Sequence, residues 1–451
     1  MKNLKNQSND YVIRVLNSPL EVTASDWNGL LALQSPDRTL NPFMRHEYLA
    51  AMHQSGSAIP KTGWTPRFVT LWLDDMLIGA CALYVKDHSY GEYVFDHAWA
   101  NAYRQHGMRY YPKAVVAVPF TPVPGARLMA RDAKERTLLI KALIAWCEEE
   151  KLSSLHLLFA NDEGIAACEK AGLMLRHSVQ FHWANMAPQR STSRETLPPK
   201  GAVPPEDGLS AELASTRSGY RDFDDFLMSL SQEKRKKIRQ ERRKVLDAGI
   251  TFRWSLGRNI STGDWDFFYQ CYERTYYEHG NAPYLSRDFF QRMQDTMPEN
   301  WLLFVAEYLD GDGQKHAVAA SLIAVTPAQP APGAKQHAKI PEQNLTAFGR
   351  YWGALARVDC LHFEACYYQP LAWCIDHGYQ SFEGGAQGEH KMARALLPVK
   401  TTSAHWLAHP SFADAVERFL AREAAGIANY MGELEQRSPF KTQRNSGESA
   451  R

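Results

Sequence analysis

The sequence lacks three features that would assign it quickly to a class of protein. Its seven cysteines are odd in number and include no Cys-x-x-Cys pair, which argues against a disulfide framework or a zinc site and favours a reducing compartment. No stretch approaches the roughly 18 apolar residues of a membrane-spanning helix, and the polar N-terminus MKNLKNQSNDY has no apolar signal core. We therefore expect a soluble, cytoplasmic protein without a membrane span.

An excess of charge of one sign is also missing. The 51 lysines and arginines nearly balance the 50 aspartates and glutamates, giving a formal net charge of +1. This balance argues against a general nucleic-acid-binding protein. With 451 residues, of which 45% are hydrophobic, the chain can form two or three domains, each with its own core.

Two segments divide the chain, and the first of them is rich in proline, serine and glycine. Ala187 to Ser215 has the composition of an exposed linker, and Thr326 to Asn344 that of a loop inside a domain. The residues after Gln436 are polar and are expected to form a disordered tail. We predict an N-terminal domain over 1–186, a linker over 187–215, a C-terminal domain over 216–435 and the tail over 436–451.

The expected order of elements repeats in the two domains. Each begins with a hairpin, continues with a third strand, and then passes through a helix into a further strand. In the first domain we expect strands at 67–73, 77–85, 114–118, 154–159 and 173–183, with helices at 133–150 and 162–171. In the second we expect strands at 301–308, 317–325, 345–353 and 380–382, with a helix at 363–377. Two such units predict a duplicated α/β domain.

Polar and aromatic side chains are most concentrated between Tyr351 and Arg394. Glu364 and Tyr368 are four residues apart on the expected helix and therefore share a face, next to Tyr367 and Gln369. A carboxylate and a phenol on one face suit general base and general acid chemistry. The alternative is a half-buried helix whose tyrosines are amphipathic packing residues.

The loop from Gly384 to Arg394 carries charges of both signs beside a glycine turn. Such a loop suits an anionic or amide-bearing substrate, and its alternative is a solvated helix N-terminus. Its candidate substrate contacts are Glu383, Gln387, Glu389, His390, Lys391 and Arg394. His362, Glu364 and His390 do not have the spacing of a metal site, and we predict no metal.

The first domain contains an aromatic and acidic segment from His88 to Trp99, HSYGEYVFDHAW, without helical or strand periodicity. It is either the wall of a substrate pocket or a packing surface between domains. The candidate pocket residues are Tyr90, Glu92, Asp96 and Trp99.

The segment from Lys234 to Lys244, KRKKIRQERRK, is strongly basic, while Leu227, Leu230, Ile238 and Val245 form one apolar stripe. The stripe predicts a helix that is anchored on one face and positive on the other. The positive face is either a phosphate-binding surface, with Lys236 and Arg239 as candidates, or simply a solvated face.

Several motifs together resemble one bacterial family. HSYGEYVFDHAW, YYPKAVVAVPFTPVPGARL, HFEACYYQ and GAQGEHK are similar to the FemAB-like predicted N-acyltransferases, a family of peptidoglycan biosynthesis or recognition. The order Tyr-x-Gly-Ala, helix, Phe-x-Gly-Gly likewise resembles the C-terminal half of Fem-type acyltransferases. The resemblance covers roughly Asn41 to Glu423. It implies tandem GNAT-like domains, each a mixed sheet flanked by helices.

The resemblance also implies a reaction, namely attack of a substrate amine on an activated acyl group. The donor would be acyl-CoA or aminoacyl-tRNA, and the acceptor a small molecule or a cell-wall precursor, with no tightly bound cofactor. Glu364 is then the expected base, Tyr368 the general acid, and backbone N–H groups near Trp352 and Gly353 the oxyanion site. GNAT enzymes bind acyl-CoA pyrophosphate after a central strand, where this chain has Gly125 and Arg127. The alternative is a recognition protein without turnover.

Overall fold

The computed structural model describes residues 11–186, 219–327, 344–386 and 388–441. The described residues form two sheets. The four-stranded sheet has the order β1 (Tyr11–Leu16), β3 (Phe68–Leu73), β4 (Met76–Cys81) and β7 (Met129–Ala130). The eleven-stranded sheet has the order β10 (Ile250–Leu256), β11 (Trp301–Leu309), β12 (Lys315–Val325), β13 (Thr346–Ala354), β14 (Ser381–Ala386), β9 (Met174–Ala184), β15 (Leu397–Leu407), β8 (Ser154–Leu157), β6 (Lys113–Val116), β5 (Leu83–Lys86) and β2 (Thr65–Pro66).

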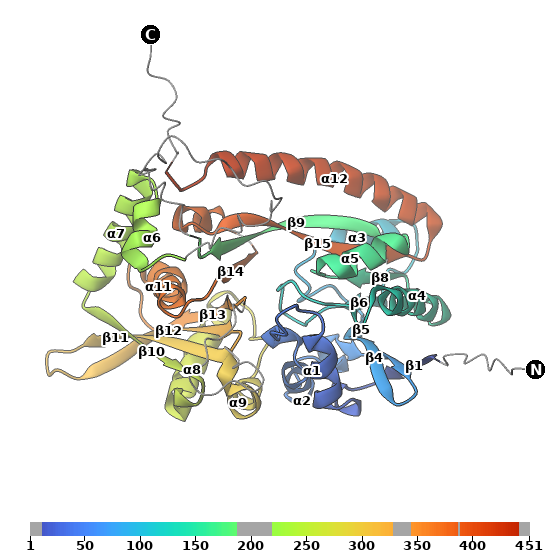
Figure 1. Ribbon diagram of the computed structural model, residues 1–451, viewed down its shortest axis with the longest axis horizontal. Helices are drawn as coiled ribbons and strands as arrows, with labels where there is room; N and C mark the ends of the chain where they lie inside the picture. The colour runs from blue at the N-terminus through green and yellow to red at the C-terminus, as the bar shows by residue number, and fades with distance from the viewer. Residues whose placement is uncertain (1–10, 187–218, 328–343, 387, 442–451) are drawn as a thin grey trace, which may run out of the picture.

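Helices cover both faces of the long sheet (Figure 1). In the first half they are α1 (Ala24–Ala32), α2 (His46–Gln54), α3 (His97–Gln105), α4 (Ala133–Glu149) and α5 (Asp162–Lys170). In the second half they are α6 (Phe223–Ser229), α7 (Gln232–Asp247), α8 (Thr262–Glu278), α9 (Arg287–Thr296), α10 (Leu361–Phe363), α11 (Gln369–Asp376) and α12 (Pro410–Gln436). Side-chain caps begin several of them: Asp132 accepts a hydrogen bond from Glu135 N at the start of α4, and Ser261 from Asp264 N at the start of α8.

The two halves exchange their last strands. Each half has a central parallel pair, β6 with β8 and β13 with β14. The strand beyond β8 is β15 from the second half, and the strand beyond β14 is β9 from the first half, both in antiparallel pairing. β9 and β15 also pair with each other along nine residue pairs, from Leu397 with His182 to His405 with Met174. The repeated arrangement agrees with a duplicated unit.

A common hydrophobic core joins the halves. One cluster of buried residues contains Trp27 and Tyr48 from the first half together with Phe290, Trp301 and Tyr351 from the second. The Tyr48 hydroxyl lies 3.1 Å from the Tyr351 hydroxyl and 3.2 Å from Thr121 Oγ1. Helix α12 packs on both β9 and β15 along one edge of the molecule (Figure 1). The halves are thus locked together by strands, core and helix.

Two expected elements differ in the structure. The strand predicted over 77–85 is interrupted at Ala82, so that β4 and β5 belong to different sheets. The helix predicted over 363–377 is α10, a π-helical turn from Glu364 to Tyr368, and α11. Pro370 has no N–H to donate and follows this turn, which is consistent with the break in the regular α-helical pattern.

The disordered tail predicted from residue 436 is wrong for its first residues. Phe440 forms a β-bridge with Leu230, and Ser231 N donates to Pro439 O at 2.9 Å. Residues 442–451, the whole predicted linker over 187–215 together with residues 216–218 after it, and most of the predicted loop over 326–344 lie outside the described residues. The domain boundaries therefore stay a prediction. No described helix is long and apolar enough to cross a membrane.

Candidate active site

Strands β13 and β14 separate at the centre of the long sheet. Their parallel pairing ends at Phe348 with Glu383, although β13 continues to Ala354 along β12. The β12–β13 register skips Arg350, which is therefore the extra residue of a β-bulge. A bulge redirects a side chain and bends its strand. The separation of the strands and the bulge at Arg350 together open the sheet at this point.

Three hollows meet at this opening, and Arg350, Tyr351 and the neighbouring backbone line them. The inner hollow, about 150 Å³, is lined by Ser321, Gly349, Arg350, Tyr351, Trp352, His362, Cys366, Tyr367, Phe382, Gly384 and Lys391. The tyrosine hollow, about 220 Å³, is lined by Tyr93, Phe120, Pro122, Tyr272, Tyr276, Tyr284, Leu285, Gly349, Arg350, Tyr351, Gly384, Gly385 and Ala386. The outer hollow, about 290 Å³, is lined by Tyr272, Thr275, Tyr276, His279, Asn281, Arg350, Tyr351 and Trp352. Both halves of the chain thus contribute to one site.

Arg350 and Tyr351 are the two residues common to all three hollows. The Nη2 of Arg350 donates to the backbone oxygen of Phe120 at 2.9 Å, which links the bulge to the first half. Its Nε is buried and has no hydrogen-bond partner. The sequence analysis missed Arg350, since one arginine in a strand has no pattern of its own.

The aromatic residues of α8 and of the loop after it were missed as well. Tyr272, Tyr276 and Tyr284 lie close to one another, with ring centroids 4.8 Å apart for the first two and 5.4 Å apart for the last two. Phe120 of the first half stacks on Tyr284 at 4.6 Å. The run of aromatic residues in α8 was the signal that could have indicated this wall.

Lys391 fixes the end of β14. Its Nζ donates to the backbone oxygens of Gly384 at 2.7 Å, Gly385 at 3.2 Å and Ala386 at 3.0 Å. Burial, and then the positive charge of Arg350, lower the pKa of Lys391 to about 8. A Cβ at Gly384 would lie 2.8 Å from Phe181 O, so β9 can approach only a glycine here. The expected contact residue Lys391 therefore lines the inner hollow from a fixed position.

Tyr367 and Trp352 also line the inner hollow, as candidate site residues should. The Tyr367 hydroxyl lies 3.3 Å from His390 Nε2, and burial raises the pKa of this tyrosine above its usual range. His390 itself is exposed, so it connects the buried phenol with solvent. Tyr367 and His390 thus form a polar pair that runs from the hollow to the surface.

Glu364, Tyr368 and Gln369 face α7 and do not line the hollows around Arg350, contrary to our expectation of a shared cleft. Arg242 Nε donates to both Glu364 carboxylate oxygens at 3.2 Å, and Gln369 Nε2 donates to Glu364 Oε1 at 2.7 Å. The Tyr368 hydroxyl donates to Glu241, which also accepts from Arg394 at 2.8 Å. Glu364 and Tyr368 share a face as predicted, but that face packs on the second half's own helix.

The remaining loop candidates are held elsewhere. Glu389 accepts from Tyr430 at 2.9 Å and from Arg437 at 3.0 Å, so it is attached to α12 and its C-terminal end. Arg394 is buried and its guanidinium lies 3.5 Å from the centre of the Phe363 ring. Gln387 lies outside the described residues. We infer a positioning role for Glu389 and Arg394 in the 3₁₀ turn from Glu389 to Arg394.

We expected the oxyanion site near Trp352 and Gly353, but on the side that faces α8 the backbone of these residues packs directly against that helix. A Cβ at Gly353 would lie 1.9 Å from Cys271 O, and Trp352 O accepts from Thr275 Oγ1 at 3.3 Å. The edge of β13 that faces β14 is different, because pairing with β14 has ended by Gly349. Backbone N–H groups that face the opening therefore lie nearer to Arg350.

Glu383 is the last residue of β14 that pairs with β13, and it lies opposite His182 of β9. Its Oε2 is buried and has no partner. Burial raises the pKa of Glu383 to about 8, although Arg350 and Arg127 oppose the shift. At neutral pH the carboxyl is thus largely protonated and neutralises little of the positive charge of Arg350.

Gly125 and Arg127 do not form a phosphate cradle in this conformation. Gly125 N donates to Phe159 O at 3.0 Å, and the Arg127 guanidinium donates to Leu158 O at 2.8 Å and to Val123 O at 2.5 Å. Arg127 is fully buried, and burial lowers its pKa to about 9. The N–H group of Gly125 and the guanidinium of Arg127 therefore already donate hydrogen bonds within the protein.

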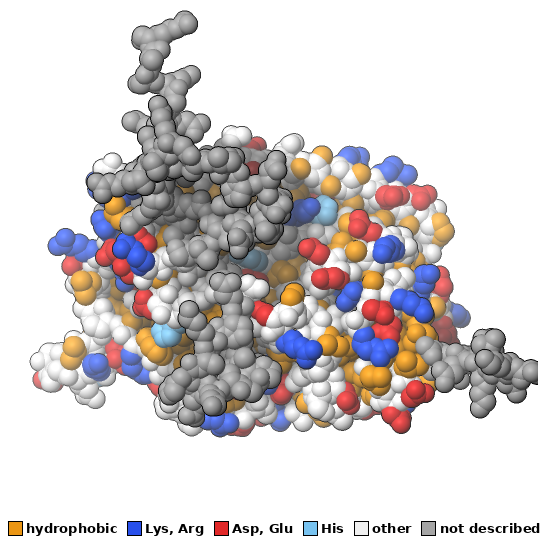
Figure 2. Space-filling model, viewed as in Figure 1, with side chains coloured by type: hydrophobic (Ala, Val, Ile, Leu, Met, Phe, Trp, Pro, Cys, Tyr) orange, Lys and Arg blue, Asp and Glu red, His pale blue; other side chains and the backbone are white. Residues whose placement is uncertain are grey.

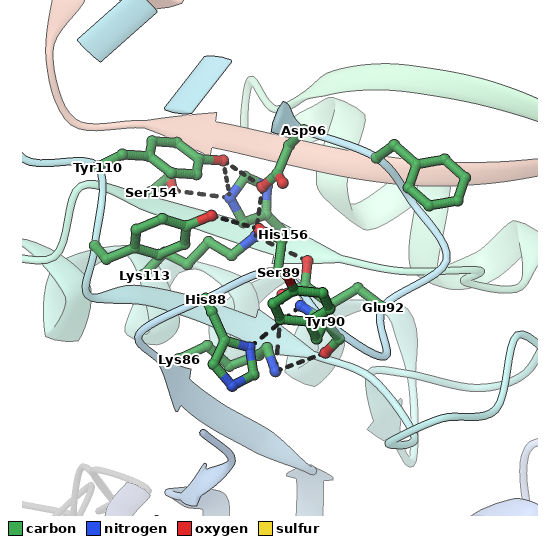
Figure 3. Close-up of polar contacts among 12 residues, drawn as sticks. Lys86, His88, Ser89, Tyr90, Glu92, Asp96, Tyr110, Lys113, Ser154 and His156 are labelled. Carbon is green, nitrogen blue, oxygen red and sulfur yellow. Dashed lines mark hydrogen bonds and ion pairs between the residues drawn. The ribbon is translucent and has the colours of Figure 1, made fainter. Parts of the chain in front are cut away.

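The aromatic and acidic segment of the first half forms a buried charge cluster (Figure 3). Lys113 Nζ pairs with Glu92 at 2.8 Å and with Asp96, and the Tyr110 hydroxyl donates to Asp96 at 2.6 Å. Burial lowers the pKa of Lys86 to about 7 and raises that of Glu92 to about 7. The cluster is a packed interior network within the first half, and is neither the pocket wall nor the packing surface between domains that we considered for this segment.

Trp99 and Tyr90 also lie outside the hollows. Trp99 packs on His405 of β15 with ring centroids 5.0 Å apart, which ties α3 to the exchanged strand. Tyr90 is 70% exposed. Of the aromatic and acidic segment only Tyr93, which was not a candidate, reaches the site.

Lys236 and Arg239 are exposed on α7, as expected, and Arg239 forms a loose ion pair with Asp224 at 3.5 Å. Ile238 and Val245 of the apolar stripe are buried. Figure 2 shows acidic and basic side chains mixed over the visible face of the molecule. No group of three or more His, Cys, Asp or Glu that could hold a metal occurs among residues 11–186, 219–327, 344–386 and 388–441.

Comparison with known families decides the classification. The model of a FemAB-like family, described as peptidoglycan biosynthesis/recognition, matches residues 18–191 and 209–442. The chain belongs to this FemAB-like family. At the level of the family it is a transferase of the acyl or aminoacyl type, and the predicted tandem GNAT-like fold is confirmed. No protein of curated function matches the chain.

Solved structures resemble the FemAB-like chain at low sequence identity. FemX has 10% identity and a TM-score of 0.48, covering 88% of this chain and 98% of its own. A tandem GNAT protein from the clavulanic acid biosynthesis pathway has 11% identity and a TM-score of 0.42, covering 89% and 99%. The L-PGS of Bacillus licheniformis has 11% identity and a TM-score of 0.42, covering 85% and 98%.

Proposed function

We propose that the FemAB-like chain is an N-acyltransferase whose reaction takes place at the opening between β13 and β14. The observation that carries the proposal is the meeting of three hollows at Arg350, where both halves contribute walls and where the strand pairing has ended. An acyl carbonyl lying in the opening is within reach of unpaired backbone N–H groups and of a guanidinium. Such fixed donors stabilise the oxyanion of an acyl transfer.

The reaction is the attack of a neutral amine on an activated acyl carbonyl. A C–N bond forms and the C–S or C–O bond to the donor breaks. The amine releases one proton to solvent, and the departing sulfur or ribose oxygen takes up one proton. The hollows suit the neutral amine, because Arg350 and Lys391 place positive charge in their lining. No described residue that lines them is an aspartate or glutamate.

Tyr367 and His390 are the proposed route for the proton. Tyr367 stays protonated because its pKa is raised, so it can donate to the leaving group from the wall of the inner hollow. His390 then restores the proton from solvent through the 3.3 Å contact. Trp352 and Lys391 shape the same hollow and hold the acyl group in place.

Phosphates of the donor are proposed to bind the exposed basic face of α7, through Lys236 and Arg239. The junction at Gly125 and Arg127 has no free donors in this conformation, whereas α7 lies against the π-helical turn that carries Tyr367. We propose an aminoacyl-tRNA or acyl-CoA donor and an amine acceptor on a cell-wall precursor or small metabolite, in the cytoplasm.

The test is a transfer assay with matched tyrosine variants. Wild-type protein is incubated with acetyl-CoA or a mixture of aminoacyl-tRNAs and a panel of amines that includes amino acids and nucleotide-linked cell-wall precursors, and amide products are identified by mass spectrometry. Tyr367→Phe should lower turnover by roughly 10²–10⁴-fold. Tyr368→Phe, one residue away and facing Glu241, should keep turnover within a few fold.

Two results would contradict the proposal. If wild-type protein consumes neither donor with any amine, the site is one of recognition without turnover. If Tyr367→Phe keeps the full rate while product is formed, the proton route through Tyr367 and His390 is wrong. Lys236→Glu with Arg239→Glu should weaken donor binding and lower its salt dependence, because two phosphate contacts are lost.

A further inference from the structure

The lining of the three hollows is positively charged without an opposing carboxylate. Arg350 belongs to all three, and Lys391 to the inner hollow. Two other buried cations of the described chain are paired with carboxylates, Lys113 with Glu92 and Asp96, and Arg394 with Glu241, whereas the buried Arg127 donates to backbone oxygens. The described lining of the hollows thus offers Arg350 no carboxylate, and the nearby Glu383, whose neutral form is favoured by burial, compensates its charge only in part. A bound anion would compensate the rest.

Arg350 also has hydrogen-bonding capacity that the described protein does not use. Only its Nη2 has a recorded hydrogen-bond acceptor, the backbone oxygen of Phe120, and its buried Nε has none. Its guanidinium carbon lies 5.8 Å from the centre of the Tyr351 ring and 5.9 Å from that of Phe43, so aromatic faces hold the group in position. A fixed guanidinium edge with a free N–H matches the two coplanar oxygens of a carboxylate.

The surfaces beside Arg350 are aromatic. In the tyrosine hollow, Phe120 stacks on Tyr284, and Tyr272 and Tyr276 complete the wall. At about 220 Å³ this hollow accommodates a small organic body and not a large polar headgroup. An anion in this place is accordingly expected to carry an apolar or planar part.

We infer that the acceptor is an amine that also bears a carboxylate, of the amino-acid class, and that Arg350 binds this carboxylate. The inference rests on the proposed function and names the substrate class of the same site. With its carboxylate on Arg350, the acceptor directs its amine toward the inner hollow, because Gly349, Arg350, Tyr351 and Gly384 line both hollows. A phosphate group needs more hydrogen-bond donors than the single guanidinium edge of Arg350 provides.

Binding without a donor tests the inference separately from turnover. The probes are free amino acids with aromatic and aliphatic side chains, each compared with its carboxamide and with its aminophosphonic acid analogue. Binding is measured by calorimetry and by quenching of intrinsic fluorescence, since Trp352 lines two of the hollows. We expect at least one acid to bind tenfold or more tightly than its amide, with the phosphonic acid weaker than the acid.

Variants of two arginines complete the design. Arg350→Gln should abolish the preference for acid over amide, and Arg350→Lys should retain only part of it because the planar fork is lost. Arg357→Gln is the control, since Arg357 is exposed on the segment after β13 and lines none of the hollows. Melting curves show whether each variant is folded.

The comparison of acid with amide in wild-type protein needs no variant, so it decides the question even if Arg350→Gln does not fold. Equal binding of acids and amides, no binding of any acid, or tighter binding of the phosphonic acids would overturn the inference. If acids bind as expected but no donor is consumed, the substrate class is supported and the proposed transfer reaction fails.

Discussion

The two halves of the chain differ at the point where the central parallel strands of each half separate. In the first half, β6 and β8 separate after Val116 and Leu157, and the loop from Val118 to Arg127 fills the gap: Gly125 forms a parallel bridge with Ala160. In the second half, β13 and β14 separate after Phe348 and Glu383, and hollows occupy the gap. Duplication thus produced one closed junction and one open junction.

The two junctions also differ in whether their charged groups have partners within the protein. In the first half, Lys113, Glu92 and Asp96 form a buried cluster of paired charges (Figure 3). The guanidinium of Arg127 donates hydrogen bonds to backbone oxygens. In the second half, Arg350 has a free buried Nε and Lys391 is paired only with backbone oxygens. Satisfied groups stabilise a fold, whereas unsatisfied groups at a hollow are available to a ligand.

The largest effect is expected for Lys113→Met in the first half. Removal of the cation leaves the buried Asp96 with the Tyr110 hydroxyl and the buried Glu92 with the more distant Lys86, at 3.9 Å, which should cost about 3–5 kcal/mol of unfolding free energy. Urea denaturation measures the loss. The same variant combined with Asp96→Asn should recover part of it. A loss below about 1 kcal/mol would show that the cluster is not structural.

Arg127→Met should lower stability by about 1–3 kcal/mol, because the backbone oxygens of Leu158 and Val123 lose buried donors. Donor and acceptor affinity of the folded protein should stay within twofold, in contrast to Arg350→Gln. Calorimetric binding and thermal melting of both variants provide the comparison. A large loss of donor affinity in Arg127→Met would instead indicate that the first junction opens to a ligand.

Glu383→Gln should change how stability depends on pH. The pKa of Glu383 in the folded protein, about 8, lies above its unfolded value of about 4.5, so the folded state holds the proton more tightly. The stabilisation is fully present below pH 4.5 and is lost as pH rises through 8. The glutamine variant lacks this loss, so its stability relative to wild type should rise between pH 5 and 8, by up to about 1.4 kcal/mol per pH unit.

Melting temperatures of both proteins at several pH values between 5 and 9 check this prediction. Lys86 and Lys391 titrate in both proteins, so their contributions largely cancel in the difference. A constant difference across this range would mean that Glu383 is ionised at neutral pH and that Arg350 has a counter-charge.

The smallest effect is expected for Glu364→Gln. Its partner Arg242 has a side chain that is 35% exposed, and the glutamine keeps a contact for Gln369, so the loss should be about 1 kcal/mol. Turnover of the folded fraction should remain within a few fold. A fall in turnover of a hundredfold or more would restore Glu364 as the catalytic base.

Many helices and strands could be predicted from the local sequence. The hairpin of β11 and β12, the helix α4 and the strand β13 lie within two residues of the predicted ranges, since each has a clear apolar period and a turn or cap at its end. The exchanged strand β15 was missed, because its place depends on pairing with β9, more than two hundred residues earlier in the chain.

The candidate site was predicted only in part. Tyr367, Trp352 and Lys391 line the inner hollow, as the density of polar residues around the helix suggested. Glu364 and Tyr368 have the same local pattern and face α7 instead. Local spacing shows which residues share a face, but not which neighbour covers that face, and the π-helical turn changes the rotation of the helix within this segment.

The sequence by itself determined the family, the duplicated α/β units, the basic face of α7 and the segment that contains the site. Only the tertiary structure decided that the first junction is closed and that the second is open. It also decided that Arg350 lies at the open junction with an unused N–H. The physical reason is that hydrogen-bond satisfaction and burial depend on segments far apart in the chain, such as Phe120 against Arg350, which no local pattern encodes.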